Sequence, residues 1–519
     1  MRAAPLLSLF LSASLCWMPV GARAQSREQS ATPNNLPNLG SVNDDEFTPS
    51  AERKLGAQIW GEIQRYRDAF DDREITEYLN LIGNQLAIIA VSPGGSGSAS
   101  PFPASEFTFF AVKDSTINAF ALPGAYIGVN TGLLTAAQTE SELASVLGHE
   151  IGHVTQRHIT SQISQGKGVN MAVLGAMLLG VLAATRGGNS AANVAQATMT
   201  FGIAGAISAQ LAFSRDAERE ADRIGFQTLT AAGYEPLGMA TFFQRLQQAS
   251  RYYEGSGPAF ATTHPLTVDR ISDIQNRVRE ARYRQHVDRF DFLLARARAT
   301  ALSDTSGAGL RESITAFKAA TADAMRGYNP QASANYYGLA VAQLALRDID
   351  GADASIKEAK SMGPEHGYLE KLQAEVRVAQ NRAAEAVDIM KAAVARWPSS
   401  LTLVDYYARA LQAAGHNDQA AQYLRERTAG FRTDPGLYEL LARSYEALGQ
   451  APRQHQALGE AYRLRGRMKG AVEQYSIAQR LMQGASSSNE DFALSSEIAS
   501  RIRELREQLK RETEDRKSS

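Results

Sequence analysis

The sequence predicts a mainly α-helical protein, in which a helical domain with a small β-sheet is followed by an α-solenoid of paired helices. Three observations support this fold class. Apolar residues recur at helical spacing through most of the chain, β-forming residues cluster only between positions 107 and 129, and a 34-residue period marks the C-terminal third. The 519 residues exceed the usual size of one domain, so several units are expected.

Residues 1–24 have the form of a secretory signal peptide. The apolar run Leu6–Val20 follows one arginine, and the sequence then ends in the small-x-small pattern that signal peptidase requires, which predicts cleavage after Ala24. A membrane anchor is the alternative, but the run is short for a span. The only cysteine, Cys16, would leave with this segment, so we expect no disulfide in the mature chain.

The charges are nearly balanced, with 54 basic and 55 acidic residues. This balance argues against a nucleic-acid partner held by bulk electrostatics. Residues 25–46 are rich in Asn, Ser, Pro and Asp, and we expect them to form a flexible leader.

Two amphipathic helices are expected over 47–66 and 74–91, because large apolar residues recur there at helical spacing. Strands are expected over 107–112 and 118–129, and Tyr126–Val129 leads into the next helix. A strand in that place often borders a cleft, where a free edge can hold an extended peptide by main-chain hydrogen bonds. An ordinary internal strand is the alternative.

The stretch Val146–His158 carries the motif on which the functional interpretation depends. His149, Glu150 and His153 spell H-E-x-x-H within a predicted helix. Residues four apart share a helix face, so two imidazoles can bind one ion while the glutamate reaches beside it. This geometry is typical of a zinc hydrolase. A surface helix whose histidines bind nothing is the alternative.

The segment after the motif is apolar. Residues 169–185 are uncharged, and 194–213 form a second, less apolar stretch. Three interpretations remain open: a buried helical hairpin, a surface segment that dips into a bilayer, and a transmembrane span. The length is at the lower edge of spanning length, and the absence of flanking Lys/Arg clusters counts against a span.

Ser214–Asp222 supplies acidic residues at helical spacing. Glu218 and Asp222 are four apart, and zinc hydrolases commonly use two histidines and one carboxylate with one open position. We predict Glu218 as the third ligand and Asp222 as the acceptor for the second N–H of a ligating imidazole. An exposed charged helix is the alternative, and Asp216 and Glu220 are predicted to be surface residues.

A short motif follows in Thr263–Pro265, which contains His264, and Arg270 comes five residues after the proline. A histidine beside a proline in a turn is often structural. The residues alone leave open whether His264 belongs to the site.

From about residue 329, small residues and prolines recur every 34 positions, which is the spacing of tetratricopeptide repeats. Examples are Ala340, Ala374, Ala408 and Ala442. Unrelated helices are the alternative. An amphipathic capping helix is expected over 492–510, and residues 512–519 are expected to fray.

Four ordered motifs resemble those of M48-type zinc peptidases: Asn118–Gly124, His149–His153, Glu218–Asp222 and Thr263–Pro265. The resemblance implies a zincin-like metalloprotease domain. It also implies that His149, His153 and Glu218 bind one Zn²⁺, that Glu150 is the catalytic base, and that His264 can occupy the free position of the zinc and hold the enzyme off. Whether His264 inhibits in this way or aids catalysis stays open, and Asp222 keeps the orienting role predicted above. In one departure, Ala125 stands where this family often has a second glycine.

With the signal segment and the repeats, the resemblance implies an exported, periplasmic zinc endopeptidase with chaperone-like activity. It would act in quality control and assembly of outer-membrane β-barrel proteins. The implied partners are unfolded or misassembled outer-membrane proteins and their assembly machinery, bound in the repeat groove. Peripheral membrane contact through 169–213 is one of the open interpretations of that segment and comes from its apolar residues. The alternative is a repeat-based periplasmic chaperone or scaffold with a weak or latent zinc site.

These interpretations predict six segments. In order, they are a signal peptide (1–24), a leader (25–46), a metalloprotease domain (47–285), connecting helices (286–328), a repeat domain (329–484), and a C-terminal helix with its tail (485–519).

Overall fold

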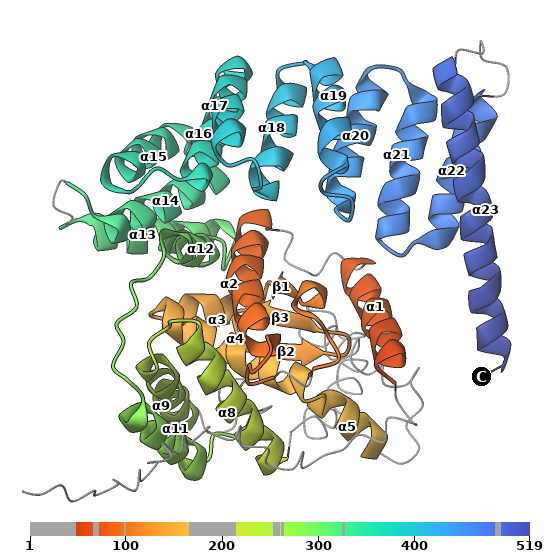
Figure 1. Ribbon diagram of the computed structural model, residues 1–519. Helices are drawn as coiled ribbons and strands as arrows, with labels where there is room; N and C mark the ends of the chain where they lie inside the picture. Colours follow the sequence, from red (N-terminus) through yellow and green to blue (C-terminus); the bar gives the residue numbers. More distant parts are fainter. Residues whose placement is uncertain are drawn as a thin grey trace, which may run out of the picture. The chain divides into compact units, whose positions relative to one another are not determined.

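The computed structural model describes residues 48–65, 72–97, 100–165, 214–252, 260, 264–323, 327–482 and 489–518 (Figure 1). The expected signal peptide, the leader and the apolar segment 169–213 lie outside these ranges, so the three interpretations of that segment stay open. Among the helices that are described, none has both the length and the apolar character needed to cross a membrane.

The described chain is mainly helical with one small sheet, which confirms the predicted fold class. The first part contains α1 (Pro49–Arg65), α2 (Arg73–Val91), the short helix η1 (Ala104–Glu106), β1 (Thr108–Val112), β2 (Ala119–Leu122), β3 (Tyr126–Asn130), α3 (Thr131–Ala136), α4 (Glu140–Thr155), α5 (His158–Gln165), α8 (Arg215–Ala231), α9 (Leu237–Tyr252) and α11 (Val268–Glu280). The second part contains α12 (Phe290–Ala301), α13 (Gly307–Thr321), α14 (Pro330–Ala345), α15 (Ile349–Met362), α16 (Gly367–Ala379), α17 (Ala383–Arg396), α18 (Leu401–Ala413), α19 (Asn417–Thr428), α20 (Pro435–Ala447), α21 (Ala451–Leu464), α22 (Met468–Met482) and α23 (Asn489–Ser518).

The sheet has the strand order β1-β3-β2, with β3 parallel to β1 and antiparallel to β2. The apolar side chains Leu55, Ile59 and Ile63 of α1 pack with Phe110 and Leu122 of the sheet. The strand that leads into α3 and the metal-motif helix is therefore internal, and the expectation that it forms a free edge is wrong. Among the described strands, β2 is the edge beside α4.

The turn between β2 and β3 explains the unusual position of Ala125. Gly124 and Ala125 both have positive φ angles, 77° and 66°, in the left-handed region that disfavours a residue with a Cβ. A second glycine would relieve this strain. The turn also packs closely on α1, where a Cβ on Gly56 would lie 2.1 Å from the carbonyl oxygen of Pro123.

Helices α14 to α21 form successive pairs, and α23 packs beside α22 after them (Figure 1). The four alanines spaced by 34 residues, from Ala340 to Ala442, are buried in the first helix of each pair. Small residues at these positions let neighbouring helices approach closely. The last helix buries Ile498, Ile502 and Leu505 and continues to Ser518, beyond the end expected at residue 510.

The two parts share one core, which extends from Leu147 in α4 through Tyr78 in α2 to Phe292 in α12 and Leu372 in α16. The first turn of α2 is bonded to the repeat helices. The Glu74 carboxylate accepts hydrogen bonds from Lys371 Nζ at 2.8 Å and from the Tyr337 hydroxyl. Neighbouring Arg73 forms ion pairs with Asp405 and Asp434, each at 2.9 Å. These contacts fix the first turn of α2 to the repeats, while later residues of the helix pack in the shared core.

Candidate metal centre

Helix α4 carries the H-E-x-x-H motif and is buried along its whole length. It is capped by Thr139, whose hydroxyl oxygen accepts a hydrogen bond from the main-chain N–H of Glu142. Because His149 and His153 are one turn apart, their rings face the same point, and their Nε2 atoms are 3.0 Å apart. The helix therefore presents two imidazoles to one place inside the protein.

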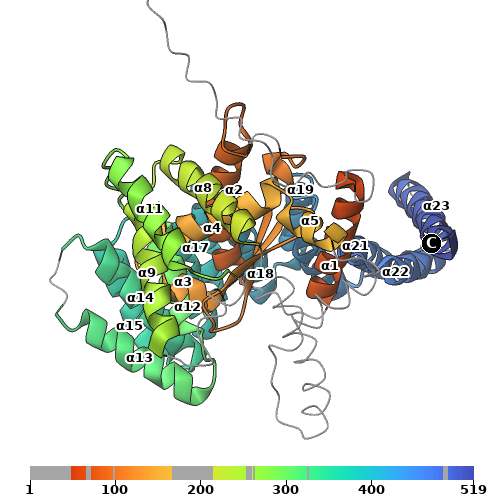
Figure 2. The same ribbon diagram turned by 90° about the horizontal axis from the view of Figure 1, so that it is seen from below.

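Helix α8 lies alongside α4 at very close range (Figure 2). A Cβ on Gly148 would lie 3.1 Å from the carbonyl oxygen of Gly225, and a Cβ on Gly225 would lie 2.8 Å from the main-chain nitrogen of His149. Gly152 meets Ala221 with similarly little space, since a Cβ there would lie 3.0 Å from the Cα of Ala221. The absence of side chains at this contact brings the α8 carboxylates next to the α4 imidazoles.

Four buried side chains converge between these helices. Glu218 Oε2 is 3.5 Å from His149 Nε2, and Glu218 Oε1 is 3.5 Å from His153 Nε2. With His264, all four ligand atoms lie within 4.8 Å of one another. Two imidazoles and one carboxylate are a common ligand set of catalytic zinc, so the donor set fits the expected ion. The structure thus brings together the three residues predicted as ligands.

Burial and the neighbouring imidazoles favour the ligand form of His153. Burial, followed by the nearby His149 and His158, holds the pKa of His153 well below its usual value. The imidazole is therefore neutral near pH 7, with one ring nitrogen free of a proton. A metal ligand requires this neutral form.

Glu150 lies beside the four converging side chains, with Oε1 3.5 Å from His264 Nε2. Burial raises the pKa of the Glu150 carboxyl, although the charges of His264 and His149 oppose the shift. Within the described residues neither of its oxygens makes a hydrogen bond of good geometry, and the main-chain N–H of Ala121 in β2 only approaches it. A buried carboxylate of raised pKa with available oxygens is suited to accept a proton.

His264 projects into the same group from the turn before α11. Its Nδ1 lies 2.9 Å from Glu218 Oε1 and 3.3 Å from His149 Nε2. Burial alone would lower the pKa of His264, but the carboxylates of Glu218 and Glu150 outweigh it and raise the pKa. The structure thus groups His264 with the predicted ligands, whereas Thr263 lies outside the described residues.

Asp222 lies behind His149, where it was predicted. Its Oδ1 is 2.9 Å from His149 Nδ1, which places the carboxylate within reach of the second N–H of that ring. Arg270 holds the same carboxylate with two hydrogen bonds of 2.7 and 2.8 Å. Burial alone would raise the pKa of Asp222, but the bonds to Arg270 and His149 lower it to about 2. Asp222 is therefore ionised throughout the neutral range.

Arg270 has a role at the site that was not predicted from the sequence. Besides Asp222, the Arg270 guanidinium contacts Glu218 Oε2 at 2.7 Å and donates a hydrogen bond to the carbonyl oxygen of Pro265 at 2.9 Å. It therefore connects the predicted third ligand with the turn that carries His264. The sequence places Arg270 five residues after Pro265, close to the turn that carries His264. This spacing could have suggested that Arg270 lies near the site, but it does not reveal which carboxylates the arginine contacts.

A pair of side chains on the other side of His153, His158 and Glu220, was also not predicted from the sequence. His158 Nδ1 lies 3.0 Å from His153 Nδ1, and His158 Nε2 lies 3.2 Å from Glu220 Oε2. The prediction that Glu220 is a surface residue is therefore wrong, because its side chain is partly buried against His158. Asp216, whose side chain is 76% exposed, is a surface residue as predicted.

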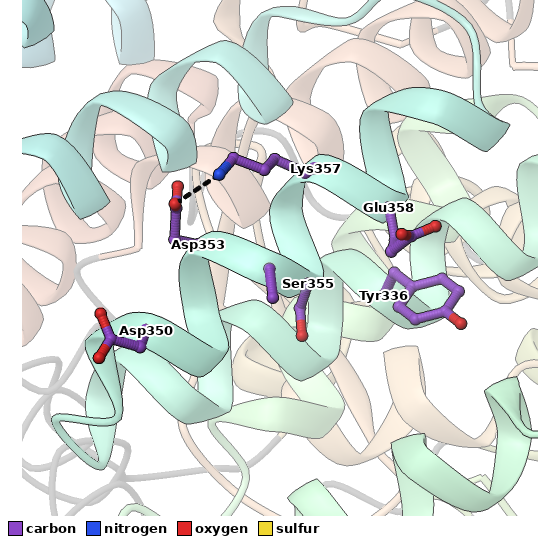
Figure 3. Close-up of a pocket in the computed structure, with 7 residues that line it drawn as sticks. Tyr336, Asp350, Asp353, Ser355, Lys357 and Glu358 are labelled. Atoms are coloured by element: carbon purple, nitrogen blue, oxygen red, sulfur yellow. Dashed lines mark hydrogen bonds and ion pairs between the residues drawn. The ribbon is translucent and has the colours of Figure 1, made fainter.

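A separate hollow lies between α14 and α15 (Figure 3). Tyr336 and the carboxylates of Asp350, Asp353 and Glu358 line it, and Lys357 pairs with Asp353 at 2.8 Å. The hollow contains no residue of the metal centre. Its charges are those of a solvated helix surface, so it carries no functional assignment.

Comparisons with known proteins agree with this geometry. Residues 95–278 match the model of Peptidase family M48. The chain is 30% identical to the putative beta-barrel assembly-enhancing protease of Vibrio cholerae over 87% of this chain and 89% of that protein. It is 28% identical to the beta-barrel assembly-enhancing protease of Escherichia coli K12, over 89% of this chain and 90% of that protein. The mitochondrial metalloendopeptidase OMA1 of Schizosaccharomyces pombe is 31% identical over 35% of this chain and 49% of its own length.

The match to M48 and the buried His/Glu group define a metallopeptidase. The Vibrio cholerae and Escherichia coli relatives extend the likeness through the helical repeats as well as the peptidase part. The chain belongs to the family of β-barrel assembly-enhancing proteases.

Proposed function

We propose that this metallopeptidase is an exported zinc endopeptidase, which acts in the periplasm in quality control and assembly of outer-membrane β-barrel proteins. The observation that carries the proposal is the convergence of His149, His153 and Glu218 beside the buried carboxylate of Glu150. The substrate class rests on the names of the relatives that match nearly the whole chain.

The donor set favours one zinc ion bound by His149, His153 and Glu218, an ion that would supply an acidified water and polarise the scissile carbonyl. Glu150 takes a proton from the attacking water and passes it to the leaving amine, a role supported by its raised pKa. Asp222 Oδ1 lies 2.9 Å from His149 Nδ1 and would accept its N–H, which would leave Nε2 of that ring available as a ligand. Arg270 keeps Asp222 ionised for this task.

The edge strand β2 is a suitable binding surface for an extended substrate. Its neighbour β3 occupies one side, and among the described strands none pairs with the other. The N–H of Ala121 in this strand approaches Glu150. A peptide that pairs with β2 by main-chain hydrogen bonds would therefore lie beside the general base, with little dependence on its side chains.

The helical repeats supply the proposed partner-binding surface. Stacked helix pairs of this kind form grooves that bind peptides or other proteins. We assign to this groove unfolded or misassembled outer-membrane proteins and their assembly machinery, together with a chaperone-like activity. Export through residues 1–24 and peripheral membrane contact through 169–213 belong to the same proposal.

Digestion of an unfolded β-barrel protein and of casein tests the peptidase function. The mature wild-type protein should cleave both, a chelator should abolish cleavage, and added Zn²⁺ should restore it. Failure of every added divalent cation to support cleavage, with protein that remains folded, would contradict the proposal. Rescue by another cation and not by Zn²⁺ would contradict the choice of zinc alone.

A second function is favoured by the position of His264. Its Nδ1 lies 2.9 Å from Glu218 Oε1 and 3.3 Å from His149 Nε2, so the ring would be able to fill the open coordination position of a bound ion and keep substrate and water out. The protein would then act mainly as a periplasmic chaperone or scaffold with a latent zinc site. His264→Ala distinguishes a latent peptidase from an active one. Higher peptidase activity than wild type indicates that His264 blocks the site, and lower activity indicates that His264 aids catalysis.

A further inference from the structure

The chain reverses direction after α4 in a way that brings a third histidine behind the metal motif. Arg157 has a positive φ of 55°, and its guanidinium pairs with the buried Glu52 at 3.1 Å. Helix α5 therefore begins with His158 packed against His153, with ring centroids 5.0 Å apart and planes at 75°. The His158 side chain is only 9% exposed.

Among the described residues, His158 contacts the far nitrogen of His153 and helix α8. Its Nδ1 is 3.0 Å from His153 Nδ1, whereas His153 Nε2 is the nitrogen that faces His149. Its Nε2 is 3.2 Å from Glu220 Oε2. His158 is absent from the group of side chains that converge on one ion, so a ligand set of three histidines from this stretch does not fit the structure.

The positions of the protons follow from these contacts. If His153 binds the metal through Nε2, its single hydrogen is on Nδ1 and is donated outward. His158 Nδ1 can accept this hydrogen only if the His158 proton is on Nε2. That proton then points at the Glu220 carboxylate, which accepts it. Every donor in this series meets one acceptor, and the series ends on a charged oxygen.

We propose that His158 is a positioning residue for His153, and that Glu220 fixes the orientation and tautomer of His158. The two metal-binding imidazoles would then be oriented in different ways, His149 directly by Asp222 and His153 through a second imidazole. Because His153 is a metal ligand only under the function proposed above, this role of His158 rests on that proposal.

His158→Phe tests the role, because it keeps an aromatic ring while removing the acceptor. The affinity for Zn²⁺, measured by competition with a chromogenic chelator, should fall about 10- to 100-fold, the usual loss when a partner of a ligating histidine is removed. His158→Gln can still accept and donate, so it should restore part of the affinity. Glu220→Gln should lose less than His158→Phe. Asp216→Asn, an exposed carboxylate on the same helix, is the matched control and should bind as wild type does.

The melting temperature of the metal-free variants separates positioning from a general structural role. If His158 is a positioning residue, its substitution lowers the affinity for zinc but leaves the melting temperature of the metal-free protein equal to that of metal-free wild type. Wild-type affinity in His158→Phe would overturn the inference. If that variant melts early without metal, wild-type affinity in Glu220→Gln overturns it instead. Absence of zinc binding by the wild type would contradict the proposed function, which is a distinct result.

Discussion

Buried carboxylates meet basic side chains in two regions of the molecule, and the two regions differ in how completely their polar atoms are bonded. At the junction of α2 with the repeats, Glu74 accepts from Lys371 and Tyr337 and pairs with Arg298 at 3.2 Å. At the metal centre, within the described residues, both oxygens of Glu150 lack a hydrogen bond of good geometry. The buried carboxylate of the first region is therefore fully paired, whereas that of the second region can still accept hydrogen bonds.

This difference distinguishes a buried carboxylate that stabilises the fold, Glu74, from one that is available for function, Glu150. Buried polar groups in proteins are nearly always bonded, and an exception needs an explanation such as a catalytic role or a ligand. Glu150 is such an exception, and its raised pKa has the same cause, since burial is not offset by a bonded partner. The pKa of Glu74 is lowered instead, because Arg298 and Lys371 outweigh its burial.

The largest expected effect is the loss of catalysis in Glu150→Gln. The amide cannot accept the proton of water, so kcat should fall by about 10²- to 10⁴-fold while the zinc content stays at the wild-type level. The free energy of unfolding should be unchanged or higher, since an unbonded buried charge is removed. Peptidase assays, metal analysis and urea unfolding of the same preparation measure all three. Retained cleavage would exclude Glu150 as the base and remove the contrast between the two regions.

The next largest effect is expected at the junction. Lys371→Met leaves Glu74 buried with one fewer positive charge, and breaking a buried pair on one side typically costs about 3–5 kcal/mol in the free energy of unfolding. Urea unfolding measures this loss. The metal content should not change, because Lys371 is not one of the residues that could hold the metal ion. A variant as stable as wild type would show that Arg298 and Tyr337 satisfy Glu74 by themselves.

A smaller effect concerns acid stability at the metal centre. The pKa of Asp222 is lowered from 3.8 to about 2. Its contribution to the free energy of unfolding is therefore present above about pH 4 and is lost as the pH falls toward 2. The shift corresponds to about 2 kcal/mol. In metal-free protein, the dependence of the free energy of unfolding on pH between 4 and 2 should be weaker for Asp222→Asn than for wild type. Equal slopes would mean that other carboxylates dominate this range.

The smallest effect is expected from an exposed ion pair on the repeats. Lys357 pairs with Asp353 at 2.8 Å, but its side chain is 60% exposed. Exposed pairs contribute less than about 1 kcal/mol, so Lys357→Ala should hardly change urea unfolding. It is the matched control for Lys371→Met, since both remove one lysine from a repeat helix. A loss as large as that of Lys371→Met would mean that burial does not decide the difference.

Periodicity made much of the molecule predictable. The spacing of four residues places His149 above His153 and Glu218 above Asp222, and the 34-residue period identifies the stacked helix pairs. Both patterns depend on residues near one another in the sequence, where the helix geometry alone fixes which side chains share a face.

Contacts between distant segments were not predictable in this way. The order β1-β3-β2 depends on which strand pairs with which, so the sequence could not reveal that β2 is the edge. The spacing of Glu220 from Glu218 suggested a solvent-facing residue, and only the reversal at Arg157 brings His158 within its reach. The contacts of Arg270 with Asp222 and Glu218 likewise join segments that are 48 or more residues apart.

The anchoring of α2 has a practical consequence for dissecting the molecule. A fragment that starts at residue 329 would expose Lys371 and Asp405 without the carboxylate and the guanidinium that bond them in the whole protein. The complementary fragment would leave Arg73 and Glu74 unmatched. Separately expressed halves would therefore be poor substitutes for the parent, and chimaeras that exchange the superhelix should carry the first turn of α2 with it.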